Sequence, residues 1–175
     1  GTGSICLGCS QDGRRIRTGG WGYLFGDEGS GYAIALAGLR AAAKAGDRRG
    51  PPTDLLQSFM KRFDLSNPYE LIGSVNSSCC ERDTIARLAV IVFESAARND
   101  IIALEILDAA AQECASMIHA ASNSLHMNEA AFPLCFTGGV LASQPNHGNR
   151  IIEKLRNLEL CPTPINTLSQ PVQGA

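Results

Sequence analysis

The sequence predicts an α/β domain that combines a mixed sheet with a large helical block. Three observations support this prediction. Two strand-like segments joined by a hairpin signal open the chain, helical segments fill its middle, and a strand–helix–strand pattern follows. Strands at both ends of a helical block are typical of α/β architecture. The chain has 175 residues, enough for one domain with a substantial core.

The first strand is predicted within residues 1–9, which start as a turn and continue as a strand, and the second strand is predicted at residues 14–18. Asp12-Gly13 lies between them, and this dipeptide favours the tight turn of a hairpin. Residues 19–31 follow, with six glycines in thirteen positions. This segment is too rich in glycine for a helix interior and too long for a tight turn, so we expect an irregular loop.

The helical block is predicted from capping residues and from apolar side chains at helical spacing. Ser30 caps a helix that a break at residues 46–52 ends, and Thr53 caps a short helix. A further piece starts at residues 66–68, where proline occupies an early helical position. Two longer amphipathic helices are expected at 81–97 and 100–124.

After the helical block, the pattern predicts a buried strand at residues 131–136 and a turn at 137–140. A helix over 146–158 and a short edge strand over 164–168 complete the prediction. This part of the chain therefore reads as a strand–helix–strand unit.

Composition narrows the classes of function. The net charge is −2, with 15 basic and 17 acidic residues, so neither nucleic acid nor an anionic membrane is an expected partner. No apolar run reaches membrane-spanning length. The seven cysteines are odd in number and mostly lie in apolar surroundings, which favours free thiols and a cytoplasmic location.

No metal site is predicted. Cys6 and Cys9 form a C-x-x-C pair, but no second pair follows at zinc-ribbon distance. His119, His126 and His147 have no partner at ligand spacing, so we assign them to packing or to the surface.

Three constellations could carry chemistry, and each also has an ordinary structural explanation. The first is the 1–4 segment, G-T-G-S, whose glycines and hydroxyls could hold a phosphate but which also occurs in common turns. The second is the 19–30 segment, which places a lone tryptophan among glycines before two carboxylates at a helix start. Carboxylates, exposed backbone groups and an aromatic ring suit a polyol ligand, although acidic residues there also complement a helix dipole. The third is T-G-G-V at 137–140, a frequent strand-to-helix turn.

The order of three motifs resembles the N-acetylglucosamine kinase family. These motifs are G-T-G-S, G-G-W-G-x-x-x-G-D-E-G-S-G-Y and T-G-G-V. That family belongs to the BadF/BadG/BcrA/BcrD-type ATPases within the actin-like sugar-kinase superfamily. The resemblance covers nearly the whole chain, and the tryptophan-containing block is its most specific part. It implies a ribonuclease H-like (actin-like ATPase) lobe and ATP-dependent phosphorylation of an amino sugar, most readily N-acetylglucosamine.

The resemblance also implies a sugar site. Gly20, Trp21 and Gly22 would line it, and Asp27 would hydrogen-bond sugar hydroxyls. Glu28 would support the loop. The small-molecule partners implied are thus an amino sugar and ATP, and a homodimer would be in keeping with such kinases.

For the cofactors, ATP and Mg²⁺, the resemblance implies a separate set of residues. Thr2 and Gly3 would contact the ATP phosphates. Ala96 would lie at a helix end facing the nucleotide, and Gly138 and Gly139 would contact adenosine. The family usually has glycine before the aspartate that follows this helix end, whereas Asn99 stands there in this sequence.

The resemblance assigns residues 1–175 to the C-terminal nucleotide- and sugar-binding lobe of a two-lobe kinase. We expect the N-terminal lobe and the last helix to lie outside these residues. No catalytic residue is assigned here, because the aspartate that acts as base is expected in the other lobe, so the lone lobe should be inactive.

Two alternatives remain open at this stage. One is an ATPase activator of a 2-hydroxyacyl-CoA dehydratase or benzoyl-CoA reductase type of system, which would hold an iron–sulfur cluster through cysteines. The other is a sugar-sensing regulator of the same fold that lacks catalysis.

Overall fold

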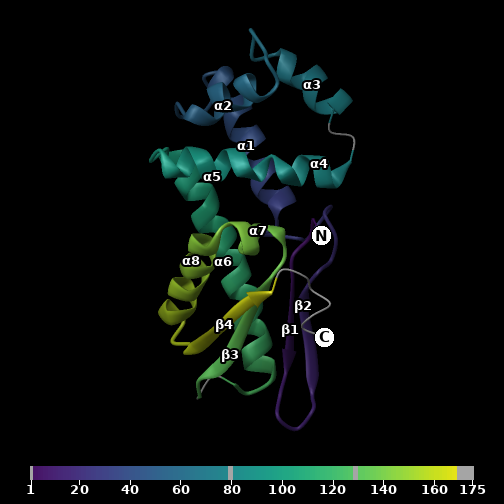
Figure 1. The fold of residues 1–175 in the computed structure, drawn as a ribbon, viewed down its shortest axis with the longest axis vertical. Helices are drawn as coiled ribbons and strands as arrows, with labels where there is room; N and C mark the ends of the chain where they lie inside the picture. The colour runs from purple at the N-terminus through teal and green to yellow at the C-terminus, as the bar shows by residue number, and fades with distance from the viewer. Residues whose placement is uncertain (1, 79–80, 128–129, 169–175) are drawn as a thin grey trace. The chain divides into compact units, whose positions relative to one another are not determined.

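The computed structural model describes residues 2–78, 81–127 and 130–168. The chain divides into two compact units (Figure 1). Unit 1 contains residues 3–29 and those from 111 onward, and unit 2 contains residue 2 and residues 30–110. Among the described residues, no helix combines the length and the apolar character that crossing a membrane requires.

Unit 1 begins with the predicted hairpin. Strands β1 (Ile5–Cys9) and β2 (Arg15–Gly19) pair antiparallel, with Leu7 opposite Arg17. Side chains alternate between the two faces of such a pair. Ile5 and Leu7 lie on the outer face, where they are 54% and 73% exposed. On the other face the Thr18 hydroxyl donates to the carbonyl of Met117, 2.8 Å away, which attaches the hairpin to helix α6.

The second half of unit 1 is the predicted strand–helix–strand unit. Strand β3 (Phe132–Thr137) and strand β4 (Pro162–Leu168) pair in parallel, and helices α7 (Gly139–Ser143) and α8 (Pro145–Asn157) connect them. Figure 1 shows α8 beside this strand pair. The apolar face of α8 packs with β3, with the segment before β4 and with the C-terminal part of α6 in a core formed by Ala111, Ala115, Ile118, Phe132, Phe136, Ile151, Ile152, Leu155 and Leu160.

Unit 2 is the helical block. It contains α1 (Gly31–Gly46), α2 (Asp54–Arg62), α3 (Glu70–Ser78), α4 (Arg82–Arg87) and α5 (Ala89–Ala97). Helix α1 packs against α2, α4 and α5. Ser30 and Thr53 cap α1 and α2 through their hydroxyls, as predicted. The long helix α6 (Ile101–Ser124) begins in unit 2 and ends in unit 1.

Two sequence-based expectations are corrected. The single helix expected at 81–97 is two helices, α4 and α5, because the backbone tightens at Leu88 to hydrogen bonds between residues three apart. Leu88 is buried, and it has no glycine or proline neighbour that could have indicated the change. The expected mixed sheet appears, within the described residues, as two separate two-stranded sheets, one antiparallel and one parallel.

Candidate functional site

The glycine-rich segment after β2 forms an exposed loop in unit 1. Trp21 is 65% exposed, and the guanidinium carbon of Arg17 lies 5.9 Å from the centroid of its ring. A Cβ at Gly26 would come within 2.8 Å of the Trp21 Cβ, so a residue without a side chain lets the chain return beside the tryptophan. The loop therefore presents an aromatic ring at the surface.

Asp27 closes this loop and is only 7% exposed. Its φ of 59° lies in the left-handed region, where aspartate is among the non-glycine residues best tolerated. The Asp27 carboxylate accepts a long hydrogen bond from the Ser4 amide, at 3.4 Å, and lies directly against Gly3. A Cβ at Gly3 would be 2.7 Å from Asp27 Oδ1, so a side chain at this position would force the carboxylate or the turn to shift.

A second contact joins the same two segments. The Ser4 hydroxyl donates to the carbonyl oxygen of Glu28 at 2.6 Å, so Glu28 supports the loop through its main chain. The structure thus brings together Gly3 of the expected phosphate loop and Asp27 of the expected sugar loop, although 24 positions separate them in sequence. The sequence placed Ser4 only among hydroxyls that could hold a phosphate, because nothing local indicates so distant a partner.

The main chain of the turn after β3 is not covered by side chains at its two glycines. Gly138 has a φ of 102°, which side chains rarely adopt, and it precedes the first turn of α7. A Cβ added at Gly138 or Gly139 would meet no heavy atom within 4 Å. The glycine pair therefore leaves room for a flat group to lie against the main chain, which fits the expected adenosine contact.

Ala96 lies at the end of α5 in unit 2 and is buried. The turn that follows contains Asn99 with a φ of 65°, the conformation that glycine usually supplies. Asparagine is the side chain that most readily replaces glycine there, so the departure from the family pattern at Asn99 leaves the turn intact.

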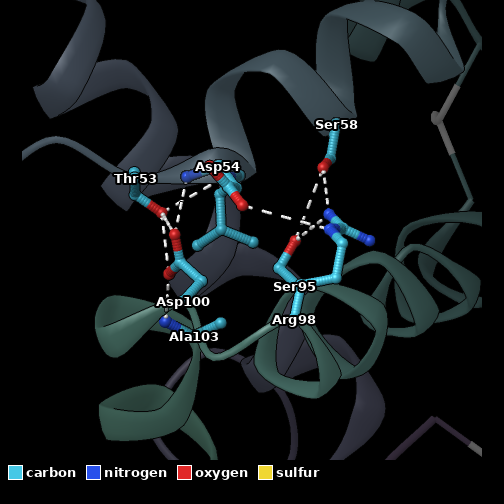
Figure 2. Close-up of polar contacts among 8 residues, drawn as sticks. Thr53, Asp54, Ser58, Ser95, Arg98, Asp100 and Ala103 are labelled. Carbon is cyan, nitrogen blue, oxygen red and sulfur yellow. Dashed lines mark hydrogen bonds and ion pairs between the residues drawn. The ribbon is translucent and has the colours of Figure 1, made fainter.

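Asp100 follows this turn and joins the starts of two helices (Figure 2). Its carboxylate accepts hydrogen bonds from the amide of Asp54 at 2.6 Å and from the amide of Ala103 at 2.8 Å. The Thr53 hydroxyl donates to the same carboxylate, at 2.9 Å from Oδ2. Arg98 donates hydrogen bonds to the hydroxyl of Ser58 and to that of the buried Ser95.

The pKa of Asp100 is lowered by this arrangement. Burial alone would raise the pKa, but the hydrogen bonds from Ala103, Asp54 and Thr53 together outweigh that effect. Sequence reasoning identified the helix end at Ala96 but not this carboxylate, because its partners at positions 53 and 54 are remote in the sequence.

The predicted site residues thus fall into separate groups. Gly3, Gly20, Trp21, Gly22 and Asp27 belong to unit 1, and the contacts of Asp27 join the two loops that contain them. Gly138 and Gly139 are also in unit 1, whereas Ala96 and Thr2 are grouped with unit 2. A single site that includes all of them stays a prediction.

The cysteines of β1 do not form a common ligand set. Cys6 and Cys9 are three positions apart on a strand, so their side chains point to opposite faces. Burial raises the pKa of the Cys6 thiol and raises that of Cys114 to about 11, so both stay protonated near neutral pH. Across residues 2–78, 81–127 and 130–168, no group of three acidic, histidine or cysteine side chains is placed to hold a metal ion.

A groove of about 610 Å³ lies in unit 1, away from these loops. It is lined by β1, the hairpin turn, the end of α6 and the start of β3, and by none of the predicted site residues.

Unit 1 thus presents an exposed tryptophan loop whose end lies against the turn at residues 3–4. The chain matches the BadF/BadG/BcrA/BcrD ATPase family over residues 1–175, and it belongs to that family.

Two curated proteins with similar sequences are described as amino-sugar kinases. It is 35% identical over 156 residues to an N-acetylmuramic acid/N-acetylglucosamine kinase of Clostridium acetobutylicum, covering 89% of this chain and 50% of that protein. It is 34% identical over 181 residues to an N-acetyl-D-glucosamine kinase of Dictyostelium discoideum, covering 100% of this chain and 56% of that protein.

A solved structure supports the fold. The chain superimposes with a TM-score of 0.68 and 25% identity on a crystal structure described as an N-acetylglucosamine kinase from Chromobacterium violaceum, covering 92% of this chain and 52% of that one. The chain therefore spans about half the length of the relatives it matches.

Proposed function

We propose that this chain is the C-terminal nucleotide- and sugar-binding lobe of an ATP-dependent amino-sugar kinase with a ribonuclease H-like, actin-like fold. N-acetylglucosamine is the favoured substrate, and glucosamine or a muramic-type sugar is the next. The observation that carries the proposal is the contact of Asp27 with Gly3 and Ser4, because it joins the tryptophan loop to the glycine–threonine turn. The names of the relatives support the same reaction class.

The exposed Trp21 ring offers an apolar surface to one face of a sugar ring, and the flanking Gly20 and Gly22 leave backbone groups accessible. A carboxylate such as that of Asp27 accepts hydrogen bonds from hydroxyl groups. These features together suit a neutral polyol, whose recognition depends on hydrogen bonds and a flat apolar contact rather than on charge.

The nucleotide would use the second set of residues. The Thr2 hydroxyl and the main chain at Gly3 would hold phosphate oxygens, and Gly138 and Gly139 would receive the adenine ring. The family resemblance assigns Ala96 to the same nucleotide. Open space at the two glycines fits this assignment. Mg²⁺ keeps much of its water and binds mainly through substrate phosphates, so it would arrive with ATP and neutralise charge on the transferred phosphoryl group.

The chain's own contribution is positioning. Phosphoryl transfer depends largely on alignment and charge stabilisation, and the residues assigned here bind and orient two substrates. We assign the base that takes the proton of the sugar hydroxyl to an aspartate of the N-terminal lobe.

A cytoplasmic location and a homodimer complete the proposal. Cys6, Cys9, Cys114, Cys135 and Cys161 are reduced, which suits a reducing compartment. The family resemblance supports the homodimer, and light scattering on the purified protein tests it.

A coupled assay tests the reaction. The protein containing both lobes is supplied with ATP, Mg²⁺ and a panel of sugars, and ADP release is followed together with formation of the sugar phosphate. We expect turnover with N-acetylglucosamine. ATP hydrolysis without any phosphorylated sugar would favour the ATPase-activator alternative, and sugar binding without turnover would favour a regulator.

A further inference from the structure

Ser4 connects two segments that the sequence separates. Its hydroxyl donates to the Glu28 carbonyl at 2.6 Å, and its amide points to Asp27 Oδ1 at 3.4 Å. The neighbouring Gly3 lies so close to the Asp27 carboxylate that a Cβ would overlap it. Three contacts thus hold residues 3–4 against residues 27–28, so a displacement of one segment would displace the other.

We propose that Ser4 is a positioning residue that links sugar binding to nucleotide binding. The inference rests on the proposed function, in which Asp27 binds the sugar and Gly3 lies beside the ATP phosphates. A carboxylate can accept several hydrogen bonds, and the Ser4 amide occupies one position on Asp27. A sugar hydroxyl on the same carboxylate would therefore fix the Asp27–Glu28 segment, and through Ser4 it would fix the phosphate turn.

The consequence is a favourable coupling between the two ligands. When the first ligand has ordered both segments, the second ligand loses less conformational freedom on binding. Coupling is reciprocal, so the sugar should tighten nucleotide binding by the same factor as the nucleotide tightens sugar binding. The Ser4 hydroxyl donates its one proton to Glu28 and so cannot also donate to a phosphate oxygen, which makes this bond the part that can be removed selectively.

The experiment measures this coupling factor directly. In the protein containing both lobes, the dissociation constant of N-acetylglucosamine is determined by calorimetry with and without a non-hydrolysable ATP analogue and Mg²⁺. We expect the analogue to tighten sugar binding by about fivefold or more. Ser4→Ala should bring this factor close to one, with a smaller change in the affinity for either ligand alone.

Two further variants keep the test selective. Ser4→Thr retains a hydroxyl and should restore most of the coupling. Ser10→Ala is the matched control, because the Ser10 hydroxyl bonds only within the hairpin turn, to Arg14 and Asp12, and its loss should leave the coupling unchanged. Should Ser4→Ala not fold, Gly3→Ala tests the same junction by inserting a methyl group against Asp27.

The possible results separate the two levels of the proposal. The role of Ser4 would be overturned if Ser4→Ala left the coupling factor unaltered, or if sugar and nucleotide bound independently in the unchanged protein. Neither result would contradict the kinase assignment. Failure of the unchanged protein to bind either ligand would overturn the proposed function itself.

Discussion

Asp100 provides the sharpest test of how the helical unit is held together. Asp100 is 9% exposed, and its carboxylate accepts hydrogen bonds from the amides of Asp54 and Ala103 and from the Thr53 hydroxyl. The two amides belong to the first turns of α2 and α6, where backbone donors have no partner within their own helix. The Asp100 side chain therefore caps α6 and also hydrogen-bonds the first turn of α2.

Replacing Asp100 by alanine removes all three acceptor contacts. Loss of a capping side chain costs about 1 kcal/mol per helix, and a buried donor without a partner adds about 1 kcal/mol or more. We expect the free energy of unfolding to fall by about 3 kcal/mol. Asp100→Asn keeps one acceptor oxygen and should cost about half as much.

Urea unfolding followed by circular dichroism measures these changes. Asp83→Ala is the matched control, because Asp83 is an exposed carboxylate paired with Arg87 on the surface of α4, where such pairs contribute little. A loss below about 1 kcal/mol in Asp100→Ala, or an equal loss in the control, would show that the Asp100 contacts do not stabilise this unit.

The pH dependence of the same variant adds an independent check. The pKa of folded Asp100 is lowered, whereas an unfolded aspartate titrates near about 3.9. Below that value the unfolded chain takes up a proton before the folded one does, so the stabilisation present above pH 4 is lost as pH falls. The stability difference between the unchanged protein and Asp100→Ala should therefore narrow in acid.

Three other predictions concern the sites and the buried histidine. In the protein with both lobes, Asp27→Ala should lower kcat/KM for the sugar because hydrogen bonds to its hydroxyls are lost. The expected loss corresponds to about 2–3 kcal/mol of transition-state stabilisation. Thr2→Val should impair ATP use in steady-state kinetics while sugar affinity is largely kept, because only a phosphate contact is removed. His147 is buried, and burial together with Arg150 lowers its pKa to about 4. The unfolded state therefore gains a proton first as pH falls, and unfolding free energy should drop by about 2 kcal/mol between pH 7 and 5 through this residue.

Each of these has a contrary result. Unchanged sugar kinetics in Asp27→Ala would remove that residue from the sugar site. A Thr2→Val variant with poor sugar affinity and normal ATP use would mean that the two loops are assigned in reverse. His147→Leu should flatten the pH dependence of stability, and a profile as steep as that of the unchanged protein would show that His147 does not cause it.

Local signals in the sequence were sufficient for most individual elements. The Asp12-Gly13 turn, the Ser30 and Thr53 caps and the strand–helix–strand pattern all predicted features that the structure contains. These signals work because a turn or a cap depends on residues a few positions apart. The specific G-G-W-G and G-D-E-G-S segments likewise sufficed to indicate the family, which the match over residues 1–175 confirmed.

Tertiary structure alone decided the features whose partners are remote. Three contacts join residues more than twenty positions apart. They are the Ser4–Glu28 hydrogen bond, the contact of Asp27 with Gly3, and the hydrogen bond from the Asp54 amide to Asp100. The break at Leu88 also lacks a local signal, because it accompanies burial of that side chain in the packed helical unit. Hydrophobic periodicity reports which face of an element is buried, but it carries no information on which distant hydrogen-bonding group will be beside it once the chain has packed.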